Sequence, residues 1–258
     1  MNIPYQNIEI EQIYSQILSE PGTSIAVCAA NSGEGVTSIA LALAQRNLVA
    51  GRSTLVVDLN IYRPAIKSLL DFDVLLPLGA NRTGNSAENE AATSAVHSIN
   101  TERLMPPQLV TTDNNTIALT GVTAPSKREH IMKLRQPGVL EKYVYNWLQQ
   151  YDNVIIDTSP INRINARNIP PERVAAACDG AILVVLAGHT TEAMLSTAVS
   201  KLNTANAQLL GCIFNDHDNP SLKNELIREA ERLAPRFGWL SKRLKKFLCN
   251  NRLLTLEI

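Results

Sequence analysis

The chain has 258 residues, of which 45% are apolar and 19% charged, and its 24 Lys and Arg residues balance 24 Asp and Glu residues. A neutral chain of this composition is neither a globally basic nucleic-acid-binding protein nor an acidic disordered one, so we expect no nucleic-acid partner. Its length and apolar content suit one α/β domain with a large core.

Short apolar runs alternate with helical patterns along the chain. The runs lack polar alternation, as strands buried on both faces of a sheet do. We predict strands over residues 24–30, 54–59, 116–119, 153–157, 181–186 and 208–214. We predict helices over residues 37–50, 139–150, 171–178, 191–205 and 221–234. The alternation indicates an α/β fold with a doubly wound, mostly parallel sheet.

Two segments stand outside this alternation. Residues 79–115 are rich in Asn, Thr, Ser, Ala and Glu without a sustained period, which predicts a surface loop or insertion, to which we assign no function. Residues 236–258 form the second segment, a basic stretch. We therefore expect one domain over residues 1–235 and a separate basic C-terminal segment.

Localisation signals are sparse. No apolar run approaches the roughly 18 residues of a membrane span. No basic residue precedes Arg46 and no apolar leader region follows the first Met, so we expect no signal peptide. The four cysteines have no CxxC spacing, and we interpret Cys28, Cys178, Cys212 and Cys249 as reduced core thiols of a cytoplasmic protein. The histidines show no metal-binding spacing: His97, His130, His189 and His217.

A glycine-containing turn, residues 30–38 (ANSGEGVTS), joins the first predicted strand to the first long helix. Backbone N–H groups at such a turn can surround a phosphate. Against the pattern GxxxxGK[ST], Gly35 and Thr37 are in place, but Ala30 replaces the first glycine and Val36 the lysine. The missing cation would weaken ATP binding and impair turnover more, because charge developing during transfer would not be neutralised. The alternative is that Gly33 and Gly35 only form a tight turn.

Two carboxylates end predicted strands. The second strand ends in Asp58 and the fourth ends in Asp157. The carboxyl ends of buried parallel strands form the mouth of a sheet, where α/β proteins bind ligands. Each residue alone is more often a cap or turn residue. Together with Thr37 they supply the oxygen ligands that a phosphate-bridging Mg²⁺ needs.

These motifs, in this order, resemble the MinD/ParA branch of P-loop ATPases. Within that branch they are similar to the cytoplasmic domain of bacterial tyrosine kinases of capsule and exopolysaccharide synthesis. The family typically reads PGEGKST, DADLRRP and YDxVIIDTPP where this chain reads SGEGVTS, DLNIYRP and YDNVIIDTSP. The resemblance covers roughly residues 8–216 and implies a P-loop NTPase fold.

Carried over by position, the resemblance implies a nucleotide loop, a metal site and an adenine contact. The loop would comprise Gly33, Glu34, Gly35, Val36, Thr37 and Ser38. The magnesium ligands would be Thr37, Asp58 and Asp157, and Asn215 would contact adenine. We expect ATP or ADP with Mg²⁺ to bind weakly or not at all.

The departures from the family pattern fall on the chemistry. Val36 replaces the lysine of the loop, and Asn31 stands where ParA/MinD proteins carry their signature lysine. In the motif that the family reads as DADLRRP, Asn60 replaces the second aspartate and Tyr62 replaces the first arginine. In the family's ExxRxxR helix pattern, used in ring assembly, Glu11 remains without both arginines. No tyrosine follows Tyr151, so the family's autophosphorylated tail is absent from this sequence.

The C-terminal segment differs in charge from the rest of the chain. Residues 1–235 carry 18 basic and 23 acidic residues, whereas residues 236–258 carry six and one. Five apolar residues recur at helical spacing and would share one face: Phe237, Leu240, Leu244, Phe247 and Leu248. Residues 236–252 would then suit an anionic membrane surface. The alternative is a terminal helix whose apolar stripe packs on its own domain or on a partner.

We therefore expect a degenerate relative of the tyrosine kinases, an accessory or regulatory protein of capsule or exopolysaccharide synthesis and export. It would be cytoplasmic, peripheral at the inner membrane face, and partnered by a polysaccharide co-polymerase or chain-length membrane protein; its oligomeric state stays open. One alternative is an active tyrosine kinase or ATPase whose loop cation comes from elsewhere, such as Lys127, Arg128 or Arg163. Another is a ParA/MinD-type positioning protein.

Overall fold

The computed structural model describes residues 3–64, 70–71, 105, 107–112, 118–163, 168–217, 222–232 and 237–250. The chain forms two compact units. The first, here called the sheet unit, comprises Met1–Leu186 and Thr190–Asn215; the second, the C-terminal unit, comprises Ala187–His189 and Asp216–Ile258. Residues 222–232 therefore group with the basic segment, whereas the division predicted from the sequence placed them in the first domain.

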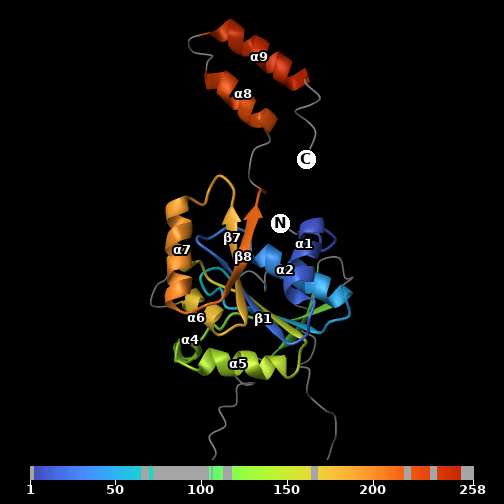
Figure 1. Ribbon diagram of the computed structural model, residues 1–258, viewed down its shortest axis with the longest axis vertical. Helices are drawn as coiled ribbons and strands as arrows, with labels where there is room; N and C mark the ends of the chain where they lie inside the picture. Colours follow the sequence, from blue (N-terminus) through green and yellow to red (C-terminus); the bar gives the residue numbers. More distant parts are fainter. Residues whose placement is uncertain are drawn as a thin grey trace, which may run out of the picture. The chain divides into compact units, whose positions relative to one another are not determined.

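One eight-stranded sheet lies at the centre of the sheet unit, in the order β3-β4-β5-β2-β6-β1-β7-β8 (Figure 1). The strands are β1 (Thr23–Ala29), β2 (Thr54–Asp58), β3 (Leu70–Asp71), β4 (Gln108–Thr112), β5 (Ala118–Val122), β6 (Asn153–Asp157), β7 (Gly180–Leu186) and β8 (Leu209–Asn215). The six from β5 to β8 in this order pair in parallel, while β3–β4 and β4–β5 are antiparallel. The predicted mostly parallel sheet is confirmed.

Helices cover both faces of the sheet. A buried cluster on one face joins α1 (Ile8–Ile13), the π-helical turn η1 (Tyr14–Leu18) and α2 (Val36–Val49) to the sheet. The cluster on the other face includes residues of α4 (Arg128–Leu134), α5 (Val139–Leu148), α6 (Pro171–Ala176) and α7 (Glu192–Thr204). The short 3-10 turn η3 (Ile161–Arg163) follows β6. This is the doubly wound arrangement predicted from the sequence.

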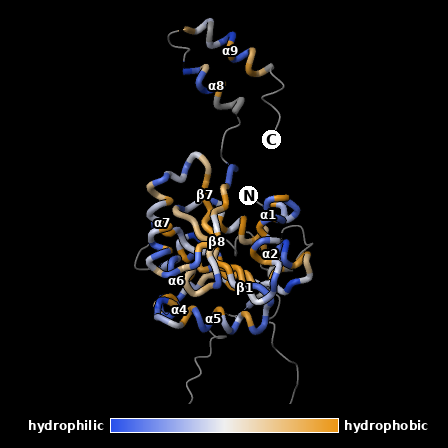
Figure 2. The backbone as a smooth tube through the Cα atoms, viewed as in Figure 1, coloured by the Kyte–Doolittle hydropathy of each residue, from blue (hydrophilic) through white to orange (hydrophobic). Residues whose placement is uncertain are grey.

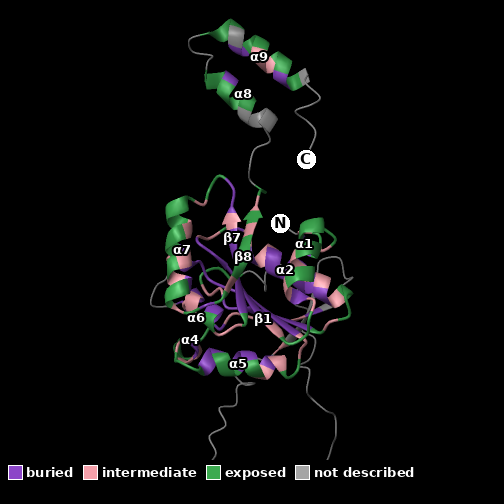
Figure 3. Ribbon diagram, in the orientation of Figure 1, coloured by how far each residue is buried: buried purple, intermediate pink, exposed green. Residues whose placement is uncertain are grey.

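The apolar runs explain the strands. In β1, Ile25 and Val27 join the cluster under α2, while Ala26 and Cys28 join the opposite one, so both faces are buried. Figure 2 accordingly shows apolar residues along the central strands. Figure 3 shows that these strands are buried, while the outer sides of the helices are exposed. Helix α2 carries the run IALALA and is buried on most of its surface, as expected of a helix in contact with β1, β2 and β6.

One expectation about the sheet unit was wrong, and one helix was not predicted. Residues 108–112, predicted to belong to a surface loop or insertion, form β4, because the polar and β-branched sequence QLVTT pairs beside β5 without needing a fully apolar run. The rest of the expected insertion, except Met105 and Pro107, lies outside the described residues. Helix α4 was also missed, since its seven residues are too few for a clear period.

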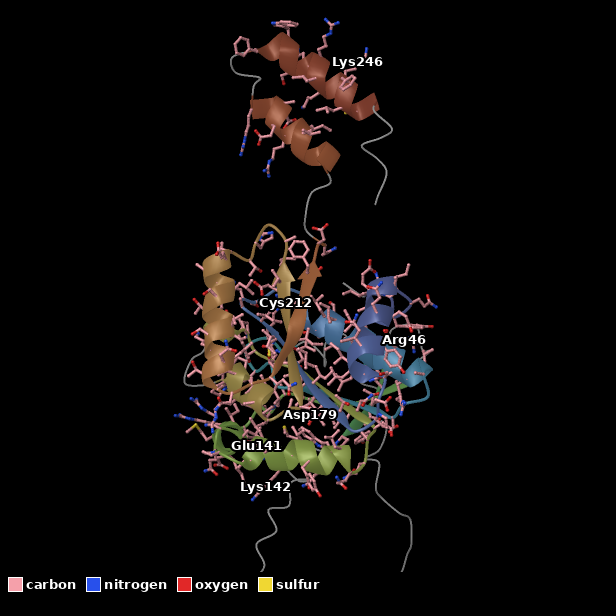
Figure 4. The ribbon with its side chains drawn as sticks, viewed as in Figure 1. Arg46, Glu141, Lys142, Asp179, Cys212 and Lys246 are labelled. Atoms are coloured by element: carbon pink, nitrogen blue, oxygen red, sulfur yellow. The ribbon has the colours of Figure 1, made fainter. Side chains whose placement is uncertain are left out.

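The cysteines are not all core residues. Cys28 is buried, Cys178 is intermediate, and Cys212 and Cys249 are exposed. Cys212 lies on β8, the strand at the sheet edge, where one side chain in two has no covering layer among the described elements (Figure 4). The apolar run around Cys212 predicted a strand correctly but wrongly predicted that both of its faces are buried.

The described residues of the C-terminal unit include the helices α8 (Leu222–Arg232) and α9 (Gly238–Asn250), which pack on each other. Ala230 on α8 and Ser241 and Leu248 on α9 are buried. An ion pair joins Lys245 to Glu231. Across the part of the chain that the structure describes, none of the helices is both long and apolar enough to cross a membrane.

Candidate phosphate-binding site

The turn between β1 and α2 has the backbone that two glycines make possible. Gly33 has φ +90° and Gly35 has φ +98°, left-handed conformations that residues with a Cβ rarely adopt. Helix α2 begins directly after Gly35, and no side chain caps its first N–H groups. These groups and the positive end of the helix dipole are therefore directed at the turn, which suits an anion.

Glu34 anchors the turn to the β7–α7 connection. Its Oε1 accepts hydrogen bonds from the Thr190 hydroxyl (2.7 Å) and the Asn31 amide (3.3 Å). The Asn31 amide also contacts Met194 Sδ at 3.2 Å. Asn31 therefore contacts the first turn of α7 instead of presenting a cation to the site.

Asn215, at the end of β8, lies against the same turn. Its Nδ2 donates a 3.0 Å hydrogen bond to the Glu34 carbonyl. A Cβ on Gly35 would lie only 2.5 Å from this amide nitrogen. Gly35 is thus required twice, by its positive φ and by the close approach of Asn215. The residue expected to contact adenine lies beside the loop.

Three polar residues expected to bind magnesium converge below the turn. Asp58 and Asp157 are directly paired in register on β2 and β6, and both are fully buried. The Thr37 hydroxyl donates a 2.5 Å hydrogen bond to Oδ2 of Asp157. Burial and, next, the neighbouring Asp58 raise the pKa of the Asp157 carboxyl well above its usual range, against the opposing effect of the Thr37 hydrogen bond.

These residues fit a magnesium ion bound with a phosphate. Oδ1 of Asp157 is buried and has no hydrogen-bond partner among the described residues. Hydroxyl and carboxylate oxygens are the ligands that Mg²⁺ prefers. Because the described residues include no group of three metal-binding His, Cys, Asp or Glu side chains, phosphate and water oxygens would complete the coordination. When bound, the ion would neutralise phosphate charge.

Val36 occupies the lysine position at the first residue of α2. Its side chain is only 8% exposed and joins the apolar cluster beneath the helix. An isopropyl group in that position offers no charge and no hydrogen bond to a phosphate. The loop therefore keeps its shape without its expected cation.

The turn opens into a cavity of about 340 Å³. Its lining comprises Ala29, residues 31–38, Asn60, Arg63, Pro64, Thr158 and Pro160. None of the candidate replacement cations, Lys127, Arg128 and Arg163, lines this cavity; Arg163 donates a 3.2 Å hydrogen bond to the Tyr62 hydroxyl instead. Arg63 does line the cavity, and sequence reasoning missed it, although its place five residues after Asp58 was a usable signal.

Glu11, the remaining assembly-pattern residue, has a partner within the chain. Arg46 on α2 donates to both of its carboxylate oxygens, and the Arg46 guanidinium lies 4.2 Å from the centre of the Tyr14 ring (Figure 4). The Arg46 hydrogen bond lowers the pKa of the Glu11 carboxyl. These contacts hold α1 and η1 on α2.

Comparison with known proteins supports the fold and the resemblance. No family model matches the chain. Over 209 residues, 81% of this chain and 76% of the relative, it is 24% identical to tyrosine-protein kinase YwqD of Bacillus subtilis (strain 168). The kinase domain of the Escherichia coli tyrosine kinase ETK superposes with a TM-score of 0.52 at 15% identity, covering 83% of this chain and 80% of that domain.

A second solved structure extends the comparison. Cobyrinic acid a,c-diamide synthase from Mycobacterium smegmatis, solved with an ATP analogue and magnesium, matches with a TM-score of 0.50 at 18% identity. That match covers 83% of this chain and 82% of the synthase. The P-loop NTPase-type fold and the resemblance to bacterial tyrosine kinases, both predicted from the sequence, are confirmed.

Proposed function

We propose that this chain is a degenerate relative of bacterial tyrosine kinases that serves as an accessory or regulatory protein in capsule or exopolysaccharide synthesis and export. The observation that carries the proposal is the buried Val36 at the lysine position, above an intact group of Thr37, Asp58 and Asp157. The site keeps oxygen ligands for magnesium and lacks the loop lysine.

This combination separates binding from turnover. Backbone N–H groups of the turn would hold a phosphate, and Thr37 with Asp157 would hold its magnesium, so ATP or ADP binds weakly. Phosphoryl transfer depends on charge neutralisation at the transferring group, which Val36 does not supply. The nucleotide would then act as a ligand that orders the turn, without being consumed.

The partner we propose is a polysaccharide co-polymerase or chain-length membrane protein at the inner face of the membrane. The sequence similarity to a tyrosine kinase supports this choice. Because the loop lacks its lysine, such a chain would act through contact with its partner, as an accessory protein does.

Incubation with γ-labelled ATP, magnesium and a tyrosine-bearing membrane partner tests this proposal. We expect no label on either protein, while the partner still co-purifies with the chain. An Asp157→Asn variant is the matched control for background labelling. Tyrosine labelling in the reaction with the unmodified chain, and not in the reaction with the variant, would instead establish the active kinase alternative.

A second function, membrane association, is supported by the outward face of α9. Trp239 is 69% and Phe247 is 65% exposed, and they lie two turns apart with Arg243 between them. Lys242 and Lys246 precede Arg243 and Phe247 directly in the sequence and are exposed. Figure 4 labels Lys246 on α9. Residues 237–250 include no acidic residue. Aromatic rings among basic side chains suit the surface of an anionic bilayer.

The expected apolar stripe is therefore divided between two faces of α9. Leu248 is buried in the helix pair that α8 and α9 form, whereas Phe247 and Phe237 are exposed. The sequence pattern placed all three on one face because it did not include the packing of α8. Any membrane face would then be built from Trp239 and Phe247 rather than from Leu248.

Flotation of the full chain with vesicles of phosphatidylglycerol and phosphatidylcholine tests membrane association. We expect a Trp239→Ala/Phe247→Ala variant to lose flotation, and phosphatidylcholine vesicles to bind neither protein. Tyr145→Ala is the matched control, since Tyr145 on α5 is also 65% exposed. Equal flotation of all three proteins would remove α9 from the membrane surface.

A further inference from the structure

We propose that Arg63 supplies the positive charge that the loop lacks, by binding the phosphates of a nucleoside diphosphate or triphosphate in the cavity beside Gly33 and Gly35. The inference rests on the proposed function, in which the site binds a nucleotide without turning it over. It names the residue and the ligand class that the proposed function leaves open.

Two segments supply most of the cavity lining, the loop and the segment after β2. Residues 31–38 form the part of the wall that belongs to the loop, and Asn60, Arg63 and Pro64 form the part that follows β2. Of the described lining residues, Glu34 and Arg63 carry charge. Oε1 of the Glu34 carboxylate accepts hydrogen bonds from Thr190 and Asn31, while its Oε2 is buried and has no hydrogen-bond partner among the described residues. Arg63 is therefore the cation of this lining that can attract an anion.

Hydrogen bonds tie the backbone of Arg63 to the end of β2. Oδ1 of Asp58 accepts a 2.9 Å hydrogen bond from the Asn60 N–H, and Oδ1 of Asn60 accepts one of 3.1 Å from the Arg63 N–H. Asp58 is fully buried, so this turn starts from a fixed point in the sheet. The arginine thus enters the cavity wall from a defined backbone position.

The local charges leave the guanidinium available. Asn60 is neutral, so the turn adds no exposed carboxylate beside Arg63. Within the described ranges, no ion pair involves Arg63, and its side chain is exposed. A guanidinium presents donors in a planar fork that fits two phosphate oxygens, and it stays charged at all physiological pH values.

Phosphate is the chemistry that both parts of the wall share. The loop offers the N–H groups at the start of α2, where no side chain caps the helix, and the segment after β2 offers the Arg63 fork. A diphosphate has oxygens enough to meet both. Pyrophosphate and ADP both carry a diphosphate, but only ADP carries a nucleoside. Comparing the affinities of the two ligands therefore separates phosphate binding from recognition of the nucleoside.

Isothermal titration of the full chain with Mg-ADP, and separately with Mg-pyrophosphate, tests the role of Arg63. We expect Arg63→Ala to raise the Kd of both ligands about ten-fold, the scale of a charged hydrogen bond to phosphate. Arg63→Lys should keep part of the affinity because it keeps the charge. Arg163→Ala is the matched control, since Arg163 bonds the Tyr62 hydroxyl and does not line the cavity.

Three results would overturn the inference: unchanged affinity in Arg63→Ala, an equal loss in Arg163→Ala, or no binding of either ligand to the unmodified chain. The last result would contradict the role of Arg63 but not the proposal that the chain is an accessory protein that transfers no phosphate. The two proposals can therefore fail separately. Thermal unfolding of each variant checks that the fold is kept. A Val36→Lys/Arg63→Ala double variant should regain the affinity that Arg63→Ala loses, because the lysine restores a cation to the same cavity.

Discussion

The Thr37 hydroxyl donates a 2.5 Å hydrogen bond to Oδ2 of Asp157, whose carboxyl is fully buried beside that of Asp58. This contact joins the first turn of α2 to the end of β6. It places a hydroxyl and a carboxylate together at the mouth of the sheet, where the phosphate turn lies. The predictions below depend on this arrangement.

Asp157→Asn should make stability less dependent on pH. Burial raises the pKa of Asp157 in the folded protein above that in the unfolded chain, about 3.9. The folded state therefore holds its proton more tightly, and this carboxyl destabilises the fold increasingly as pH rises from about 4 through the folded pKa. We expect the variant to match the unmodified chain near pH 4 and to exceed it in free energy of unfolding at pH 8.

Urea unfolding between pH 4 and pH 8 measures this difference. Magnesium serves as the control, because an ion bound by the charged carboxylate would stabilise the unmodified chain and not the variant. A constant difference between the two proteins at all pH values would contradict the raised pKa.

Gly35→Ala should destabilise the fold by about 2 kcal/mol or more, since alanine strains a left-handed backbone and its Cβ would collide with the Asn215 amide. Gly33→Ala is the matched control, because Gly33 has a similar φ but no heavy atom within 4 Å of the added Cβ. It should cost about 1 kcal/mol. Denaturant unfolding would measure both, and a Gly35→Ala/Asn215→Ala variant should recover the excess. Equal losses in the two single variants would show that Asn215 does not crowd the turn.

Val36→Lys should restore affinity for nucleotide. Val36 lines the cavity as well as the apolar cluster, so a lysine stem can replace its packing while the ammonium reaches the cavity. We expect Mg-ADP to bind about ten-fold more tightly. Val36→Met, of similar length without charge, should show no gain. Titration calorimetry would decide, and unchanged affinity in Val36→Lys would mean that the site has lost more than its cation.

Two of the four thiols should react rapidly in the native protein. Cys212 and Cys249 are exposed, whereas burial raises the pKa of the Cys28 thiol to about 12 and that of the Cys178 thiol still further. With Ellman's reagent at pH 8 we expect two fast thiols, and all four after unfolding in urea. Cys212→Ser should leave one fast thiol. Four fast thiols in the native protein would contradict the burial of Cys28 on β1.

The sequence predicted the parallel core of the sheet closely and its edges poorly. The predicted strand over residues 153–157 coincides with β6, because a strand buried on both faces is apolar throughout. β8 lies at the sheet edge and keeps an apolar run although Leu210, Cys212 and Phe214 are exposed. The sequence of β4 is rich in polar residues and therefore lacks the apolar run by which the other strands were predicted.

The sequence also identified the residues that meet at the site, through their order along the chain. Thr37, Asp58, Asp157 and Asn215 converge on one turn, as the strand ends predicted. Arg63 was missed because it belongs to an exposed turn, whose direction is set by the hydrogen bonds of Asn60 rather than by any periodic pattern.

The central claim is that the site does not transfer phosphate from ATP. A single-turnover reaction, with the full chain in excess over γ-labelled Mg-ATP, tests it most directly by following both free phosphate and protein-bound label. We predict that neither rises above the level of Asp157→Asn over many hours. Release of phosphate or labelling of protein by the unmodified chain, absent in that variant, would contradict the account.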